Sequence, residues 1–141
     1  MTKFQKGWIS ALIDGEGCLS IIFKHEKKRP NPGISCIITI SNTNEKLLKF
    51  AQKIVKGTLR KLKLQKNRKL CYLLTIYAKQ LRLILPLPFI VKKQQQKILL
   101  KLLKLLNGKG CGKGNRRPIW KYKKLIKLKK ELHILNQRGG K

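Results

Sequence analysis

The sequence predicts a single α+β domain in which a helix followed by a two-stranded hairpin occurs twice and further helices follow, an αββαββα order. Its 141 residues are enough for one hydrophobic core and too few for two. Apolar residues recur at helical spacing over residues 4–13, and they alternate with polar residues over 18–24 and 34–41. The same succession returns after residue 42. We therefore expect a twisted sheet of four antiparallel strands with helices on one face.

The first helix is expected to end at Asp14-Gly15-Glu16-Gly17, because the glycines interrupt its pattern. Asn-Thr-Asn-Glu at residues 42–45 supplies capping side chains for a second helix that runs to about residue 55. In the second hairpin, the pattern does not decide which face of the return strand points inward. The remaining expected segments are hairpin strands at 61–65 and 70–77, helices at 78–85 and about 89–106, a connector at 107–118 and a basic helix at 119–135. The core spans about residues 4–106.

The charge of the chain points to a strongly negative partner. Thirty-five Lys and Arg stand against five Asp and Glu, a formal net charge of +30. Nucleic-acid phosphates are the first candidates. The four cysteines form no Cys-x-x-Cys pair, so zinc-site spacing is absent. No run of 18 apolar residues occurs, so we expect a soluble protein without a membrane partner.

One face of the predicted sheet is expected to contact the nucleic acid. If helices cover the apolar face, the other face is polar and basic, and a twisted β-ribbon fits the major groove of DNA. A charged strand face can also be merely solvated, but the total charge favours binding. The residues expected at this surface are Ser20, Ile22, Lys24, Ser35, Ile37, Thr39, Lys61, Lys63, Gln65, Asn67 and Arg68.

Residues 9–17, Ile-Ser-Ala-Leu-Ile-Asp-Gly-Glu-Gly, resemble the nine-residue signature of the LAGLIDADG homing endonucleases, and Trp8 precedes it as often happens in that family. The stretch 88–96 is similar to one found in the single-motif members. The sequence departs from the signature at Ile9 and Ala11, and its second acid is Glu16 instead of Asp. The element order extends the resemblance over about residues 5–106.

The resemblance implies a homodimeric, site-specific DNA endonuclease that cuts both strands of a long pseudo-palindromic site and promotes intron mobility. Its implied cofactor is Mg²⁺, for which Mn²⁺ or Ca²⁺ can substitute in binding. By position, Glu16 matches the metal-binding acid, and Gly15 matches the adjacent backbone carbonyl ligand. The other matches are Lys93 as the basic residue near the attacking water, Asn42 as a water-positioning amide and Lys46 as a second base.

Small or short side chains form one stripe of the first helix, at Gly7, Ser10, Ala11 and Asp14. Such a stripe lets a second backbone approach, and a single motif per chain then implies a two-fold symmetric dimer. The two Glu16 side chains would meet at the axis, where a divalent cation could neutralise them. Asp14 itself is expected to cap backbone donors at the turn.

Two other functions remain open from the sequence. An intron-RNA maturase could use the same fold and the same basic sheet. A non-catalytic basic protein, such as a ribosomal component binding rRNA or DNA, would explain the charge but not the paired acids. Single-motif members are often encoded by chloroplast or mitochondrial introns, and the lysine-rich composition is typical of AT-rich genomes. We therefore expect an organellar location.

Overall fold

Four strands form one antiparallel sheet in the computed structural model, which describes residues 1–24, 33–62, 69–107 and 118–138. The strands lie in the order β1-β2-β4-β3. Their bounds are β1 (Gly17–Lys24), β2 (Gly33–Asn42), β3 (Thr58–Lys61) and β4 (Tyr72–Tyr77). The helices are α1 (Lys3–Glu16), α2 (Glu45–Val55), α3 (Ala78–Ile84), α4 (Lys93–Asn107) and α5 (Ile119–Arg138). The predicted α+β class and αββαββα order are confirmed.

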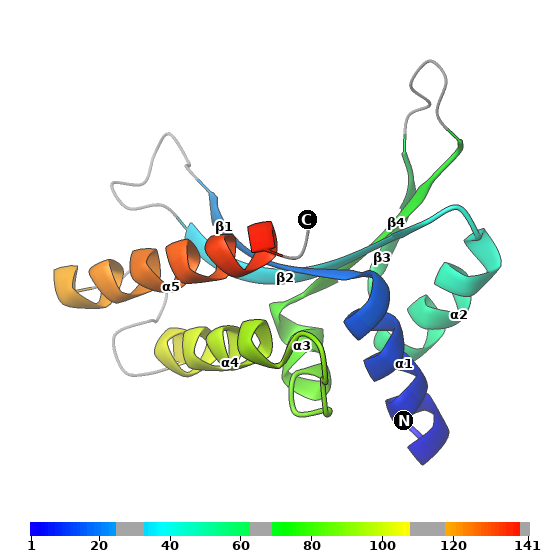
Figure 1. Cartoon of the computed structure of the whole chain (residues 1–141), viewed down its shortest axis with the longest axis horizontal. Coiled ribbons are helices and arrows are strands. Elements are labelled where there is room, and N and C mark those ends of the chain that lie inside the picture. The colour runs from blue at the N-terminus through cyan, green and yellow to red at the C-terminus, as the bar shows by residue number, and fades with distance from the viewer. Residues whose placement is uncertain (25–32, 63–68, 108–117, 139–141) are drawn as a thin grey trace.

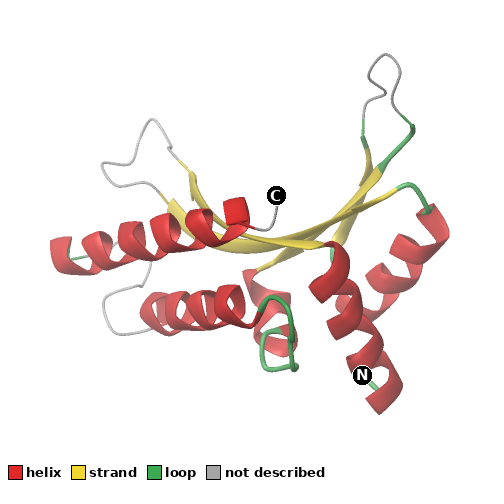
Figure 2. Cartoon of the chain, viewed as in Figure 1, coloured by secondary structure: helices red, strands yellow, loops and turns green. Residues whose placement is uncertain are grey.

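The helices leave one face of the sheet open. Helices α1 to α4 lie on the same side of the curved sheet, and α5 runs along its edge beside β1 (Figures 1 and 2). The Asn136 side chain of α5 donates a hydrogen bond to the Leu19 carbonyl of β1 at 2.9 Å. Because an edge strand presents backbone groups without a strand partner, this contact covers part of that edge.

Alternating residues of the strands build the core against the helices. Leu19 and Ile21 of β1 are buried, as predicted, whereas Ser20 and Ile22 on the opposite face are partly exposed. Burying a Leu or Ile side chain stabilises the fold by about 1.5–3 kcal/mol. The strand residues buried against the helices include Ile34, Cys36, Ile38, Ile40, Leu74 and Ile76. Burial also raises the pKa of the Cys36 thiol to about 11.

The strand pairing decides the orientation of β4, which the sequence pattern left open. Leu74 and Ile76 lie opposite Ile40 and Ile38, so they face the core, and Thr75 faces the open side. Register then aligns a row of small side chains across the open face, namely Cys18, Thr39, Thr75 and Thr58.

The face predicted for Lys61 is wrong. Strand β3 begins at Thr58, before the predicted hairpin strand, and Thr58 pairs with Thr75 on the open face. Because side chains alternate, Arg60 shares that face, whereas Lys61 falls on the same side as Leu59. Leu59 pairs with the buried Leu74, which marks the helix side. The polar face of this strand is therefore shifted by one residue.

Two helix boundaries also differ from the sequence pattern. Helix α1 continues through Asp14, Gly15 and Glu16 instead of stopping at Asp14. Helix α4 begins at Lys93, later than the expected position near residue 89, because the preceding backbone N–H groups bind a side chain of α1. Among the helices that the structure describes, none combines the length and apolar character needed to cross a bilayer.

Helix α2 ends at a residue in a strained backbone conformation. Lys56 has φ 56° and ψ 34°, the left-handed region that favours glycine. We expect Lys56→Gly to stabilise the fold by about 0.5–1 kcal/mol, because relief of strain exceeds the entropy that glycine adds to the unfolded chain. Thermal or urea unfolding measures this change. The matched control, Lys53→Gly within α2, should destabilise by about 1 kcal/mol. Equal effects of both substitutions would contradict the prediction.

Candidate active site

The junction between α1 and β1 presents Glu16 to solvent. The Gly17 N–H donates to the Ile13 carbonyl and closes the last turn of α1. A Cβ at Gly17 would lie 2.6 Å from that carbonyl oxygen, so only glycine fits. The chain therefore passes from helix to strand without a loop. Glu16 and Gly15 are both exposed at this point.

Asp14, two residues earlier, holds the segment before α4. Its carboxylate accepts hydrogen bonds from the backbone N–H groups of Ile90 at 2.5 Å, Val91 at 3.1 Å and Lys92 at 2.8 Å. Partial burial acts to raise the pKa of Asp14. The three hydrogen bonds and the Lys92 ammonium outweigh that effect, so the pKa lies below its usual value. Asp14 was expected to cap backbone donors at the helix-to-strand turn, but the donors that it caps lie in the distant segment before α4.

The Lys92 side chain folds back onto the end of α1. Its ammonium group donates to the Asp14 carbonyl and, at 3.3 Å, to the Gly15 carbonyl. The last turn of α1 contains no basic residue of its own. A cation at a helix C-terminus is favourable because the exposed carbonyls carry partial negative charge. Lys92 thus supplies this cation from another part of the chain.

Lys92 was missed by sequence reasoning, which selected Lys93. Lys93 is the exposed first residue of α4, and within the described residues it forms no hydrogen bond or ion pair with the end of α1. Two adjacent lysines look alike in the sequence. The signal that separates them is Asp14, because its hydrogen bond to the Lys92 backbone brings that residue beside Gly15.

The oxygen donors at the end of α1 suit a hard divalent ion but form only part of a site. Glu16 offers a carboxylate and Gly15 a backbone carbonyl, and both donor types are ligands for Mg²⁺ and Ca²⁺. Within the part of the chain that the structure describes, no group of three His, Cys, Asp or Glu side chains could hold a metal ion. The residues fit a metal if another molecule completes the ligand set.

Known structures with this architecture are homing endonucleases. The archaeal intron-encoded homing endonuclease I-Vdi141I, complexed with DNA, superposes with a TM-score of 0.74 at 22% identity over 94% of this chain and 84% of that chain. The chain has the LAGLIDADG homing-endonuclease fold.

Two further structures support the assignment of the fold. I-CvuI, in complex with the I-CreI target in the presence of Mg, gives a TM-score of 0.66 at 18% identity over 94% of this chain and 82% of that one. The I-LtrWI LAGLIDADG homing endonuclease bound to target DNA gives 0.70 at 15% identity, covering 93% of this chain and 45% of that one. No protein-family model and no curated protein sequence matches the chain.

In this homing-endonuclease fold, the end of β2 lies beside the α1–β1 junction, because Ile40 pairs with Gly17. Asn42 follows two residues later, and its side-chain oxygen accepts a hydrogen bond from the Asn44 N–H at 2.8 Å. Asn44 in turn caps α2. Lys46 is exposed in the first turn of α2. The structure thus places Asn42 near the Glu16 end of α1, while Lys46 extends into solvent.

The open sheet face contains most of the described residues that were predicted to bind DNA. Ser20, Ile22, Ser35, Ile37 and Thr39 lie on it and are partly exposed. The Lys24 side chain and residues Lys63, Gln65, Asn67 and Arg68 lie outside the part described. Sequence reasoning missed five described residues of this face because the register of the second hairpin was unknown. They are Thr58, Arg60, Leu73, Thr75 and Tyr77.

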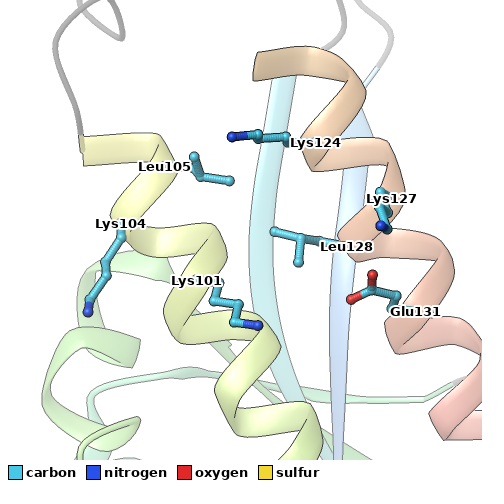
Figure 3. A pocket seen from close by; sticks show the side chains of 7 residues that line it. All are labelled: Lys101, Lys104, Leu105, Lys124, Lys127, Leu128 and Glu131. Carbon is cyan, nitrogen blue, oxygen red and sulfur yellow. The ribbon is translucent and has the colours of Figure 1, made fainter. Parts of the chain in front are cut away.

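A second basic surface lies between α4 and α5 (Figure 3). It is a hollow of about 400 Å³ in which Lys101 of α4 and Lys124 of α5 extend over the apolar side chains of Leu105 and Leu128. Lys104, Lys127 and Glu131 complete its lining. An adjoining hollow of about 350 Å³ shares Lys101 and Glu131. This groove belongs to the helical layer and includes none of the residues at the end of α1.

Proposed function

We propose that this chain is a site-specific DNA endonuclease that hydrolyses both strands of a long pseudo-palindromic site, as a homodimer with a divalent metal ion such as Mg²⁺. The observation that carries the proposal is the exposed pair of oxygen donors, Glu16 and the Gly15 carbonyl, at the end of α1 beside the open sheet face. Several solved structures with this fold are complexes with DNA, and some of them were obtained with Mg or Ca.

The exposed face of α1 supports a homodimer. Gly7, Ala11 and Gly15 recur every four residues on that face. A Cβ at Gly7 or Gly15 would meet no atom of the chain within 4 Å, so packing within the chain does not require glycine there. Close approach of a second α1 would require it. The other two residues predicted for this interface, Ser10 and Asp14, instead bond to the 88–92 segment of their own chain.

Exposed apolar side chains flank this stripe. Phe4 is 69% exposed, Ile90 86% and Val91 76%. Ile90 and Val91 lie near the end of α1 because their N–H groups bind Asp14. A second copy would cover them and bring its own Glu16 and Gly15 to the axis. The comparison with I-LtrWI supports this arrangement. This chain matches 45% of the I-LtrWI chain, so one I-LtrWI chain is long enough to contain two units of this size.

In the proposed reaction, the two Glu16 carboxylates would hold divalent cations near the two-fold axis of the dimer. The open sheet faces of both protomers would bind the DNA. A bound divalent ion supplies charge stabilisation of the attacking and leaving oxygens and lowers the pKa of its water. Asn42, beside the junction, orients the attacking water through its amide. Lys and Arg side chains around the sheet contribute phosphate contacts, which fix the position of the duplex.

Substituting the interface should separate dimerisation from folding. Ala11 is exposed, so Ala11→Arg creates no clash within the chain but brings two bulky cations together at the axis. We expect the variant to sediment as a monomer and to lose at least about 100-fold in double-strand cleavage. Ile119→Arg, at an exposed position at the far end of α5, is the matched control and should remain a dimer. A dimeric, active Ala11→Arg protein would refute this interface.

The proposed function can be tested without knowledge of the natural target. Duplexes bound by the protein are selected from a random pool, and the enriched duplexes are then incubated with Mg²⁺. Cleavage of both strands within the bound site is expected, and chelation of the metal with EDTA should stop it. Tight binding without cleavage in either Mg²⁺ or Mn²⁺ would reject the endonuclease. An origin in a chloroplast or mitochondrial intron remains part of the proposal, and the selected site can be compared with such genes.

An intron-RNA maturase is the second candidate. The lysine-lined groove between α4 and α5 favours it, because that groove offers phosphates a surface away from the open sheet face. A splicing assay on the host intron, with and without the protein, separates the two functions. Splicing that does not depend on the protein would remove the maturase.

A further inference from the structure

We infer that Lys92 is a resident cation of the active site, bound to the Gly15 carbonyl without metal and displaced from it when metal binds. The inference rests on the proposed metal-dependent nuclease function and extends it to a residue that the signature does not contain. Its basis is the contact of the Lys92 ammonium with the carbonyls of Asp14 and Gly15. Gly15 is the residue whose carbonyl is proposed as a metal ligand.

The backbone around Lys92 is fixed, whereas its side chain can move. Asp14 accepts the Lys92 N–H at 2.8 Å, and the Lys92 carbonyl accepts the Gln96 N–H at 2.9 Å. These two bonds hold the residue beside the end of α1. The side chain itself is only partly buried, and its four-carbon stem rotates easily. Lys92 can therefore leave the Gly15 carbonyl without any change in the backbone.

A metal ion and the Lys92 ammonium would compete at the Gly15 carbonyl. The ammonium lies 3.3 Å from the oxygen, and Mg²⁺ or Ca²⁺ binds such an oxygen at about 2.0–2.6 Å. Both cations on one oxygen would then lie less than about 6 Å apart, where like charges repel. Metal binding must therefore displace the amine, and the energy of that displacement weakens the metal affinity.

The same contact has a function before metal binds. In the proposed dimer, two Glu16 carboxylates and the negative ends of two α1 helices meet near the axis. One Lys92 ammonium from each protomer offsets most of this charge, which stabilises the metal-free dimer. On displacement, each amine is released at the edge of the site, beside the DNA phosphates.

Lys92→Met and Lys93→Met form the matched pair that tests this inference. Mn²⁺ binding to the full-length protein is measured by electron paramagnetic resonance, and unfolding is measured with and without Mn²⁺. We expect Lys92→Met to bind Mn²⁺ about tenfold more tightly than the wild type. Without metal, it should also unfold at a lower temperature, and Mn²⁺ should remove the difference. Lys93→Met should match the wild type in both measurements.

Lys92→Gln provides a second variant if Lys92→Met folds poorly, because its amide still donates to a carbonyl but carries no charge. It too should bind Mn²⁺ more tightly than the wild type. If the wild type binds Mn²⁺ and neither Lys92 variant binds more tightly, this inference is overturned and the metal-dependent nuclease stands. If the Mn²⁺ affinity of Glu16→Gln equals that of the wild type, the proposed metal site at Glu16 is rejected. The proposed competition between Lys92 and the metal is then rejected too.

Discussion

Glu16→Gln is expected to lower the rate of DNA cleavage by at least about 10³-fold while DNA affinity stays within about threefold of the wild type. The substitution keeps the shape of the side chain and removes the charge that holds a divalent ion. Glu16 is exposed and forms no hydrogen bond or ion pair among the described residues, since the last turn of α1 is completed by backbone groups of Ile13 and Gly17. Stability should therefore be unchanged.

Single-turnover cleavage of a selected site, together with a binding titration in Ca²⁺, measures both quantities. Glu131→Gln is the matched control, because it makes the same chemical change in the groove between α4 and α5. That variant should cleave at the wild-type rate. Undiminished cutting by Glu16→Gln would exclude Glu16 as the metal-binding acid. A loss of binding equal to the loss of cleavage would indicate a role in DNA affinity instead.

The sequence predicted the element order and the position of Glu16 because both depend on local signals. Gly17 marks the end of α1, although the helix continues through Gly15, and alternation in 34–41 indicates which residues of β2 face the core. Structural comparison supports the fold that those signals imply. The sequence did not predict contacts that depend on pairing between distant segments.

Lys92 and the open face of β4 illustrate that limit. Residues 92 and 93 are both lysines and have the same helix propensity, so the sequence does not distinguish them. The hydrogen bonds from the 90–92 segment to Asp14 do. The run Tyr-Leu-Leu-Thr-Ile-Tyr in β4 is apolar on both faces, so alternation cannot decide its orientation. Pairing of Thr75 with Thr39 decides it. In both cases the missing information is non-local.

Asp14→Asn is expected to destabilise the protein by about 3 kcal/mol at pH 7, because three backbone donors lose their charged acceptor. The carboxylate binds the N–H groups of Ile90, Val91 and Lys92, which lie 76 to 78 residues away in the sequence. An asparagine keeps one acceptor oxygen but places an amide group against the remaining donors. Loss of these bonds frees the start of α4 and releases Ile90 and Val91 of the proposed dimer interface from the end of α1, so cleavage should fall as well.

The pH dependence gives this prediction a sign. The pKa of Asp14 is lowered in the folded protein. The ionised carboxylate therefore stabilises the fold fully at pH values above the pKa that Asp14 has in the unfolded chain, which is about 3.9. The stabilisation is lost as pH falls through the lower folded pKa. The gap in unfolding free energy between wild type and Asp14→Asn should therefore be constant from about pH 7 to 5 and shrink below about pH 4.

Urea unfolding at pH 7, 5 and 3 measures this gap. Glu45→Gln is the control, because within the described part of the chain the Glu45 carboxylate forms an exposed pair with Lys49 at 3.1 Å and caps no distant segment. That variant should change stability by no more than about 0.5 kcal/mol. A gap for Asp14→Asn that is equally small at pH 7 would show that the 90–92 segment is held by other contacts. A gap that grows toward pH 3 would contradict the lowered pKa, since protonation of the wild-type carboxyl must weaken the same three hydrogen bonds.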